Sequence, residues 1–427
     1  MPLTEKDTCT SVVYAVPISS EDNYAANTIL ATAEQPATAV PLLLANEEAI
    51  ATAANIIAGG GIAAFPTETV YGLGADASNP DAVARVYHAK GRPGDNPLIS
   101  HIADLDAFKQ LTVDVLDYAH GLIKSFWPGP LTLVAKKSPG LPHWLGGHPN
   151  GRAGTIGIRM PSHPIALALI KESGCFIAAP SANKAGTPSP TCAQHVAADF
   201  ADGSIDFILD GGAVPGGLES TVVDITGPRP VILRPGAITP EMVWKATRIE
   251  PLMSKEFYSH IAPRGVSTAA ESFITSEPPR APGMKYRHYA PKAPMTLLVG
   301  DEDGIAAYII QQAAKKLPEG RKMGILLTTQ AMERLKAYKP DRFFPKDQNQ
   351  QCEAVFALLL GDKAAPDTIA KNLYACLRQF DSLGVDEIYA EGLTQDGLGI
   401  AIMDRMKKAA EGRVVHVPDK NSFHMHG

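Results

Sequence analysis

From residue 250 to residue 294 the chain loses the hydrophobic periodicity that precedes and follows this stretch. Pro, Ser, Glu and Gly fill it instead, a composition typical of linkers. Patterns of strands and helices lie on both sides, so the break predicts two folded domains joined by a linker. The length of 427 residues agrees, because a single hydrophobic core stops growing at about 250–300 residues.

Residues 45–249 predict a mixed α/β domain, and residues 1–44 predict a loosely ordered N-terminal extension. A hairpin is expected in "STVVDITGPRPVILRPG", where Gly227 and Pro228 separate two β-branched runs. The other expected elements are helices at 47–58, 80–89 and 114–125, and strands at 62–65, 98–101, 131–136, 155–159, 176–179 and 207–210.

Residues 295–420 predict a second, smaller domain. The strand-like runs "MTLLVGD", "MGILLTT", "GVDEIYAEG" and "RVVHVPD" alternate with helical stretches such as "DGIAAYIIQQAAKKL" and "IAIMDRMKKAAEG". Strands that alternate with helices predict a doubly wound parallel sheet.

Charge and cysteine content narrow the class of protein. The net charge of -6 provides no global attraction for nucleic acid, which requires a basic surface. The five scattered cysteines never form a CxxC pair, which indicates reduced thiols and a cytoplasmic location. Glu5 and Asp7 argue against a transit peptide, and the charge-free run 49–67 is interpreted as a small-residue helix followed by a strand rather than a membrane span.

None of the common catalytic or nucleotide-binding sequence motifs assigns a function to this chain. The run "GLGADA" at 72–77 fits G-x-G-x-x-A, but a dinucleotide fingerprint must close a strand and open a helix, and Pro66 and "TET" precede this one. The terminal "HMHG" is interpreted as solvated. The sequence contains no Walker A, HExxH or GxSxG pattern.

Seven polar clusters distinguish the first domain: "FPTETVYGLGA", "KGRPGDNPLISHI", "WPGPLTLV", "TIGIRMPSHP", "APSANKAGTPSPT", "LESTVVDI" and "ILRPGAIT". Each lies at an expected strand end or loop, where α/β folds build binding sites. The clusters contain few carboxylates. Their cations and neutral donors suit a nucleotide triphosphate together with a small carboxylic acid. The candidate side chains are Lys90, Arg92, Arg159 and Arg234, the hydroxyls of Thr67, Thr69, Ser181, Ser220 and Thr221, the amides of Asn96 and Asn183, and His101.

Each of these residues also has a structural interpretation. Arg159 could pair with a surface carboxylate, His101 could be a core histidine, and Ser181 or Asn183 could cap a turn. Seven clusters in one domain are harder to explain in this way.

The seven clusters, in this order, resemble those of the YrdC-like family of L-threonylcarbamoyladenylate synthases. "APGMKYRHYAP" at 281–291 resembles the linker of the longer, two-domain members, and "GLGIAIMDRMKKAA" resembles their C-terminal domain. The resemblance covers residues 45 to 420. It implies an α/β fold in which a YrdC-like twisted mixed sheet with helices precedes a Rossmann-like domain.

The resemblance also implies a reaction. L-threonine, bicarbonate or carbon dioxide, and ATP would give threonylcarbamoyl-AMP and pyrophosphate, with Mg²⁺ held by the ATP phosphates and no metal ligand from protein side chains. Partner enzymes would pass the threonylcarbamoyl group to the adenosine beside the anticodon of tRNA. Direct tRNA binding is expected to be weak or absent, and no general base is evident.

Site residues follow from the matching motifs. Lys90 and Arg92 are implied to be catalytic, and a linker segment around Tyr286 is expected to close over ATP, although a solvated linker would have the same composition. The implied ATP contacts are Arg92, Asn96, Thr155, Asn183, Thr191, Arg234 and Tyr286, and the implied threonine contacts are Thr69, His101, Arg159, Ser181 and Ser220.

Two alternatives stay open. A non-catalytic RNA-binding or regulatory module would explain Lys90, Arg92 and Arg234, but the acidic net charge and the lack of basic patches interleaved with aromatic residues argue against it. Carbamoyl transfer in hydrogenase maturation also uses a YrdC-like domain. That setting would bring CxxC pairs and an acylphosphatase-like segment, which this sequence lacks.

Overall fold

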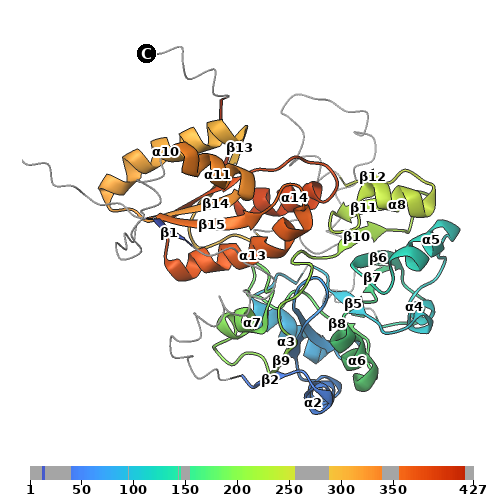
Figure 1. Ribbon diagram of the computed structural model, residues 1–427. Helices are drawn as coiled ribbons and strands as arrows, with labels where there is room; N and C mark the ends of the chain where they lie inside the picture. Colours follow the sequence, from blue (N-terminus) through green and yellow to red (C-terminus); the bar gives the residue numbers. More distant parts are fainter. Residues whose placement is uncertain are drawn as a thin grey trace, which may run out of the picture. The chain divides into compact units, whose positions relative to one another are not determined.

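The computed structural model describes residues 12–14, 40–94, 96–142, 144–145, 154–254, 288–338 and 355–418 (Figure 1). The chain divides into two compact units. One comprises residues 27–288 and 395–404, and the other comprises residues 1–26, 289–394 and 405–427. Each unit is built on its own sheet.

Within the described residues, the first unit contains an eleven-stranded sheet in the order β12-β11-β10-β6-β7-β5-β8-β4-β3-β9-β2. Parallel pairs such as β5–β7 and antiparallel pairs such as β6–β7 occur in the same sheet, so the predicted mixed sheet is confirmed. The strands are β2 (Leu42–Leu44), β3 (Ala63–Phe65), β4 (Gly72–Asp76), β5 (Ile99–His101), β6 (Leu131–Lys136), β7 (Thr155–Arg159), β8 (Ile177–Ala178), β9 (Phe207–Asp210), β10 (Thr221–Asp224), β11 (Val231–Arg234) and β12 (Leu252–Met253).

Local sequence signals set the helix ends of this unit. Asn46 caps α2 by accepting a hydrogen bond from Ala49 N (2.8 Å). Helix α3 ends at Lys90 because Gly91 adopts a left-handed conformation (φ 60°), which turns the chain directly before Arg92. The helices are α2 (Glu47–Ala58), α3 (Pro80–Lys90), α4 (Leu105–Leu111), α5 (Asp117–Phe126), α6 (Pro164–Ser173), α7 (Ala193–Asp199) and α8 (Pro240–Thr247).

The run "GLGAD" is strand β4, not a phosphate-binding turn. It pairs antiparallel with β3 and with β8. A Cβ on Gly74 would lie 2.6 Å from Ile177 Cγ2 and 2.8 Å from Phe65 Cε1, so glycine permits close packing inside the sheet. The interpretation of "GLGADA" as a false dinucleotide fingerprint is therefore confirmed.

The second unit contains a parallel sheet in the order β1-β15-β14-β16-β13-β17, and every described strand pair in it is parallel. The predicted parallel sheet is confirmed. The strands are β1 (Val12–Tyr14), β13 (Met295–Val299), β14 (Met323–Thr328), β15 (Val355–Gly361), β16 (Glu387–Glu391) and β17 (Val414–His416).

Helices cover both faces of this second sheet. In Figure 1, α10 and α11 lie on one side of β13 to β15 and α13 lies on the other, as expected for crossovers that reverse direction in a doubly wound sheet. The helices are α10 (Glu302–Lys316), the short 3₁₀ helix η2 (Leu317–Glu319), α11 (Thr329–Tyr338) and α13 (Pro366–Leu383). Helix α14 (Gly399–Ala409) is divided, since its residues up to 404 count with the first unit and the rest with the second.

Several elements were not predicted. Two of them lie within residues 1–44, expected to be loosely ordered: β1 pairs with β15, and β2 pairs with β9. In the second unit, β15 and α13 had no predicted counterpart. The run 49–67 is the helix α2 followed by strand β3, as predicted. In the described part of the chain, no helix is long and apolar enough to cross a membrane.

Candidate active site

Arg159, the last residue of β7, lies at the centre of the candidate site. Strand register places His101 of β5 beside it on one side and Thr132 of β6 beside it on the other. Only 4% of Arg159 is exposed. Three neighbouring strands therefore bring a guanidinium, an imidazole and a hydroxyl to one region of the sheet.

The Arg159 guanidinium is held on three sides. Nη1 donates a hydrogen bond to Thr69 Oγ1 (2.9 Å), and Nε donates to the Gly129 carbonyl (3.3 Å). Nη2 lies 2.7 Å from Oε1 of Glu68 and forms an ion pair with it. The predicted proximity of Thr69 and Arg159 is thus observed. The surface carboxylate considered for Arg159 is instead a largely buried one.

Glu68 was not singled out from the sequence, although it lies within "FPTETVYGLGA". Burial by itself would raise the pKa of the Glu68 carboxyl, but the charge and hydrogen bond of Arg159 outweigh it and hold the pKa below its usual value. The carboxyl is therefore ionised at neutral pH. The local signal that could have revealed it is an acidic residue between two threonines at a strand end.

His101 is buried and neutral. Burial, reinforced by the nearby charge of Arg159, lowers the pKa of this imidazole to about 3. Nδ1 lies 3.1 Å from the Ile99 carbonyl oxygen, which only accepts, so we assign the proton to Nδ1. The ring packs edge-on against Phe65, with 6.3 Å between ring centroids.

Ser220 connects Arg234 to the Arg159 region. Arg234 donates from Nε and Nη2 to the Ser220 carbonyl (3.1 and 3.0 Å) and from Nη2 to Ser220 Oγ (3.2 Å). Ser220 Oγ also lies 2.8 Å from Thr132 Oγ1, the strand neighbour of Arg159. The fold thus brings Arg159, Ser220 and Arg234 together.

Lys90 holds the loop that carries Ser181 and Asn183. Its Nζ donates to the carbonyls of both residues at 2.5 Å, and only 3% of the residue is exposed. Ser181 Oγ in turn donates to Asn183 Oδ1 (2.5 Å). Lys90 was predicted as a catalytic cation, and these contacts give it the additional task of shaping the loop.

The Tyr71 backbone joins this loop to the one that carries Thr191. Tyr71 O accepts from Ala182 N (2.8 Å), and Tyr71 N donates to Pro190 O (3.0 Å). Asn183 is the residue after Ala182, and Thr191 is the residue after Pro190. Two predicted ATP contacts are thereby brought close together.

The turn after α3 places the remaining cation. Arg92 donates to the carbonyls of Asn96 (3.0 Å) and Pro97 (2.9 Å). Oδ1 of Asn96 is buried and has no hydrogen-bond partner among the described residues, so it can accept a bond from a ligand.

Thr155 begins β7, at the opposite end from Arg159 and roughly 13 Å from it along the strand. Thr155 pairs with Lys136 of β6, so the described strand pairs do not bring it to Arg159. Tyr286 lies outside the described residues.

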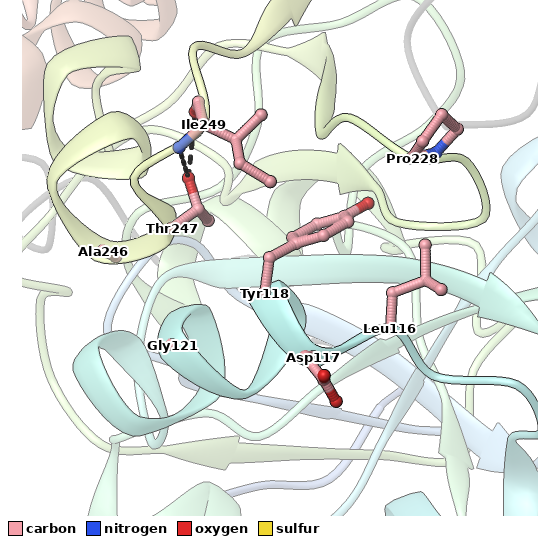
Figure 2. Close-up of a pocket in the computed structure, with 8 residues that line it drawn as sticks. All are labelled: Leu116, Asp117, Tyr118, Gly121, Pro228, Ala246, Thr247 and Ile249. Atoms are coloured by element: carbon pink, nitrogen blue, oxygen red, sulfur yellow. Dashed lines mark hydrogen bonds between the residues drawn. The ribbon is translucent and has the colours of Figure 1, made fainter.

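A surface groove of about 640 Å³ lies elsewhere in the first unit, between α5, the β10–β11 turn and α8 (Figure 2). None of the predicted ATP or threonine contacts lines it. Its lining residues are Leu116, Asp117, Tyr118, Gly121, Pro228, Ala246, Thr247 and Ile249.

Comparison with known families matches both units. Residues 55–236 match the Sua5, YciO and YrdC family model, described as telomere recombination, and residues 238–411 match the model described as threonylcarbamoyl-AMP synthase, C-terminal domain. A threonylcarbamoyl-AMP synthase of Bacillus subtilis is 44% identical over 87% of this chain and 96% of its own length. The chain belongs to the threonylcarbamoyl-AMP synthase family.

A second synthase and a solved structure match this chain to a similar extent. The Pyrococcus abyssi synthase is 43% identical over 86% of this chain and 96% of its own length. A crystal structure of P. abyssi Sua5 complexed with L-threonine matches with a TM-score of 0.73 and 41% identity, over 89% of this chain and 99% of that one. The family expected from the motifs is confirmed, and the alternative of a non-catalytic RNA-binding module is not favoured.

Proposed function

We propose that the first unit binds L-threonine and ATP at the Arg159 region and joins them, with bicarbonate or carbon dioxide, into threonylcarbamoyl-AMP. The observation that carries this proposal is the buried Arg159 guanidinium between Thr69 and His101, close to a second cation, Arg234. A buried, fixed guanidinium suits a small carboxylate, and the nearby cations suit phosphates.

On the threonine side, Arg159 binds the α-carboxylate of the substrate. Neutral His101 adds no positive charge, and its Nε2 can accept a hydrogen bond from the substrate hydroxyl. Thr69, Ser181 and Ser220 provide further hydroxyl groups around the substrate.

On the ATP side, Lys90, Arg92 and Arg234 carry the charge that the phosphates require. Asn96, Thr155, Asn183 and Thr191 add neutral polar contacts, and Tyr286 stays a prediction for the linker. Mg²⁺ enters bound to the ATP phosphates. The ATP phosphates are the proposed Mg²⁺ ligands, because Mg²⁺ prefers oxygen ligands and is commonly bound through substrate phosphates.

The reaction has two bond-forming steps. The threonine ammonium first gives up one proton to water or bicarbonate, and the free amine attacks the carbon of carbon dioxide. Formation of the N–C bond breaks one C=O π bond, and a second proton passes from the nitrogen to water or bicarbonate, which leaves a carbamate. A carbamate oxygen then attacks the α-phosphorus of ATP, and the bond from that phosphorus to the pyrophosphate oxygen breaks. Charge develops on the leaving pyrophosphate, so positioned cations stabilise the transition state.

The product is a labile mixed anhydride, so a second enzyme must consume it. We place this chain in the cytoplasm, upstream of the machinery that transfers threonylcarbamoyl groups to the adenosine next to the tRNA anticodon. Its own contacts are with small molecules, and the net charge of -6 argues against tight tRNA binding.

The test is a pyrophosphate-release assay with the full chain, ATP, Mg²⁺, bicarbonate and L-threonine, in which each component is omitted in turn. Release that requires both threonine and bicarbonate, with a product of the mass of threonylcarbamoyl-AMP, is the expected result. ATP binding without threonine-dependent release would contradict the proposal, and affinity for tRNA would then be measured.

A further inference from the structure

The Arg159–Glu68 ion pair is a feature that phosphate chemistry does not require. The exposed side-chain fractions are 5% for Arg159 and 12% for Glu68, and Oε1 lies 2.7 Å from Nη2. Removing both charges from water costs free energy that their mutual attraction only partly returns, so such a pair is weak evidence of a stabilising role. Glu68 places a negative charge beside Arg159, the residue proposed to bind the substrate carboxylate. This arrangement indicates that Glu68 contacts the substrate as well.

We propose that Glu68 binds the amino group of the substrate, so that Arg159 and Glu68 together recognise an α-amino acid as a zwitterion. This inference rests on the proposed threonine pocket and adds a residue that determines its specificity.

The charges around the pocket support this role. Arg159 is positive and Glu68 is negative, whereas His101 and His163, the two imidazoles that interact with them, both have pKa values lowered by burial. These four groups therefore sum to zero charge at neutral pH, and the next cation, Arg234, is the one assigned above to the ATP phosphates. A zwitterion adds no net charge to such a site, whereas a carboxylic acid without an amino group adds one uncompensated negative charge beside Glu68.

The hydrogen-bonding capacity of Arg159 leaves room for the substrate. A guanidinium has five N–H groups, and Gly129 O, Thr69 Oγ1 and Glu68 Oε1 are its described partners. Two N–H groups are left for a substrate carboxylate. The ammonium group of an α-amino acid is attached to the carbon that bears the carboxylate, so a ligand held by Arg159 places its nitrogen near Glu68.

Glu68 also has a carboxylate oxygen, Oε2, that can accept a hydrogen bond from a ligand. Oε2 is buried and has no hydrogen bond at full geometry among the described residues, although the backbone N–H groups of Glu68 and Ser162 lie near enough to the carboxylate to help lower its pKa. An ammonium group would supply the missing donor, with charge on both partners. The carboxyl has a pKa below its usual value, so it binds the ammonium without taking its proton. We therefore expect Glu68→Gln to change the affinity for threonine far more than kcat at saturating threonine.

The experiment compares two ligands by isothermal titration calorimetry on the full chain. One is L-threonine, and the other is the 2,3-dihydroxybutanoate of matching stereochemistry, in which a hydroxyl replaces the ammonium. In Glu68→Gln, threonine should bind at least about tenfold more weakly, since one partner of a buried charged contact is lost. The ratio of the dissociation constant for threonine to that for the analogue should rise by the same factor. Glu172→Gln, an exposed change on α6, is the matched control and should keep the wild-type ratio.

Two results would overturn the inference: threonine affinity in Glu68→Gln within about twofold of wild type, or an equal loss for both ligands, which would mean that Glu68 only supports Arg159. Circular dichroism checks folding, and Glu68→Asp, which keeps the charge, should recover part of the selectivity. Arg159→Met separates the two proposals. Unchanged threonine binding in that variant would reject the pocket itself, whereas lost binding together with a neutral Glu68→Gln would reject only the role of Glu68.

Discussion

At the scale of single residues, burial decides what each charged or polar group can do. Arg159 and Lys90 are both cations with less than 5% of their surface exposed, yet their partners differ. Lys90 donates to two backbone carbonyls, whereas Arg159 contacts a hydroxyl, a carbonyl and a carboxylate. Because the planar guanidinium of Arg159 is held on several sides, its remaining N–H groups point in a fixed direction.

Arg159→Lys should therefore impair threonine binding more than ATP binding. Lysine keeps the charge but cannot make bidentate contact with a carboxylate, so we expect KM for threonine to rise about 10- to 100-fold, which corresponds to roughly 1.4–2.8 kcal/mol. Steady-state pyrophosphate release measures both KM values. Arg229→Lys, at an exposed position on the β10–β11 hairpin, is the control. Equal increases in both KM values would argue against a threonine-specific role.

His101 should make the stability of the first unit depend on pH. Its folded-state pKa of about 3 lies below the ordinary value of 6.5, so the unfolded chain binds the extra proton as the pH falls. The stabilising contribution is complete above pH 6.5 and is lost toward pH 3. As the pH falls below 6.5, His101→Asn should reduce the slope of unfolding free energy by up to about 1.4 kcal/mol per pH unit, and Glu68, which both proteins keep, contributes to the slope in each.

Urea unfolding followed by tryptophan fluorescence measures this slope, because Trp127, Trp144 and Trp244 all lie in the first unit. His120→Asn, on the exposed side of α5, is the control. A slope that His101→Asn leaves unchanged would mean that the imidazole is not held neutral.

At the scale of elements, strand ends collect polar residues in both units. In the second unit, Glu391 at the end of β16 is fully buried. Its Oε2 accepts from Thr328 N (2.8 Å) and Thr328 Oγ1 (2.7 Å), and its Oε1 pairs with Lys363 Nζ at 2.6 Å. The carboxyl ends of β14 and β16 are thus joined by one carboxylate.

Lys363→Met should destabilise these strand ends, because it leaves the buried Glu391 charge without its cation. We expect a loss of about 2–3 kcal/mol, less than for a fully buried pair, since 33% of the Lys363 side chain is exposed. Hydrogen exchange of the amides in 323–328 and 387–391 measures it. Lys109→Met removes a fully exposed ion pair and should cause no measurable change. Equal protection in both variants would show that Glu391 does not depend on Lys363.

At the scale of the whole molecule, the two units have separate hydrophobic cores. In the described residues, the core that contains Leu327 and Ile325 in the second unit shares no member with the cores around Leu133 and Phe65 in the first. Separate cores predict that a cavity in one unit affects that unit first.

Leu327→Ala tests this separation. Leu327 is fully buried in β14, so its truncation should destabilise the second unit by about 2–5 kcal/mol. Hydrogen exchange in β13 to β16 should accelerate, while the urea midpoint reported by tryptophan fluorescence should stay unchanged. A midpoint that falls in parallel with the loss of protection would mean that both units unfold as one cooperative block.

Local sequence signals by themselves predicted the two α/β sheets and the polar clusters at strand ends. These features are encoded within a few residues, as in the Asn46 cap, the glycine after Lys90 and the apolar run of β14. The predicted linker, 250–294, begins too early, because β12 (Leu252–Met253) still pairs with β11 in the first sheet, and residues 255–287 lie outside the described residues. The motifs also predicted the family. Most candidate residues could be named in this way, because turn chemistry and strand ends are local properties.

Only the tertiary structure decided how these local pieces combine. Strand β4 has too many glycines for a strand signal, and it forms because β3 and β8 pair with it on both sides. Glu68 and Arg159 are far apart in the sequence, and the order of strands in the sheet brings them to 2.7 Å. No short-range pattern encodes that contact, because the pairing of distant strands depends on burying both faces of the whole sheet at once.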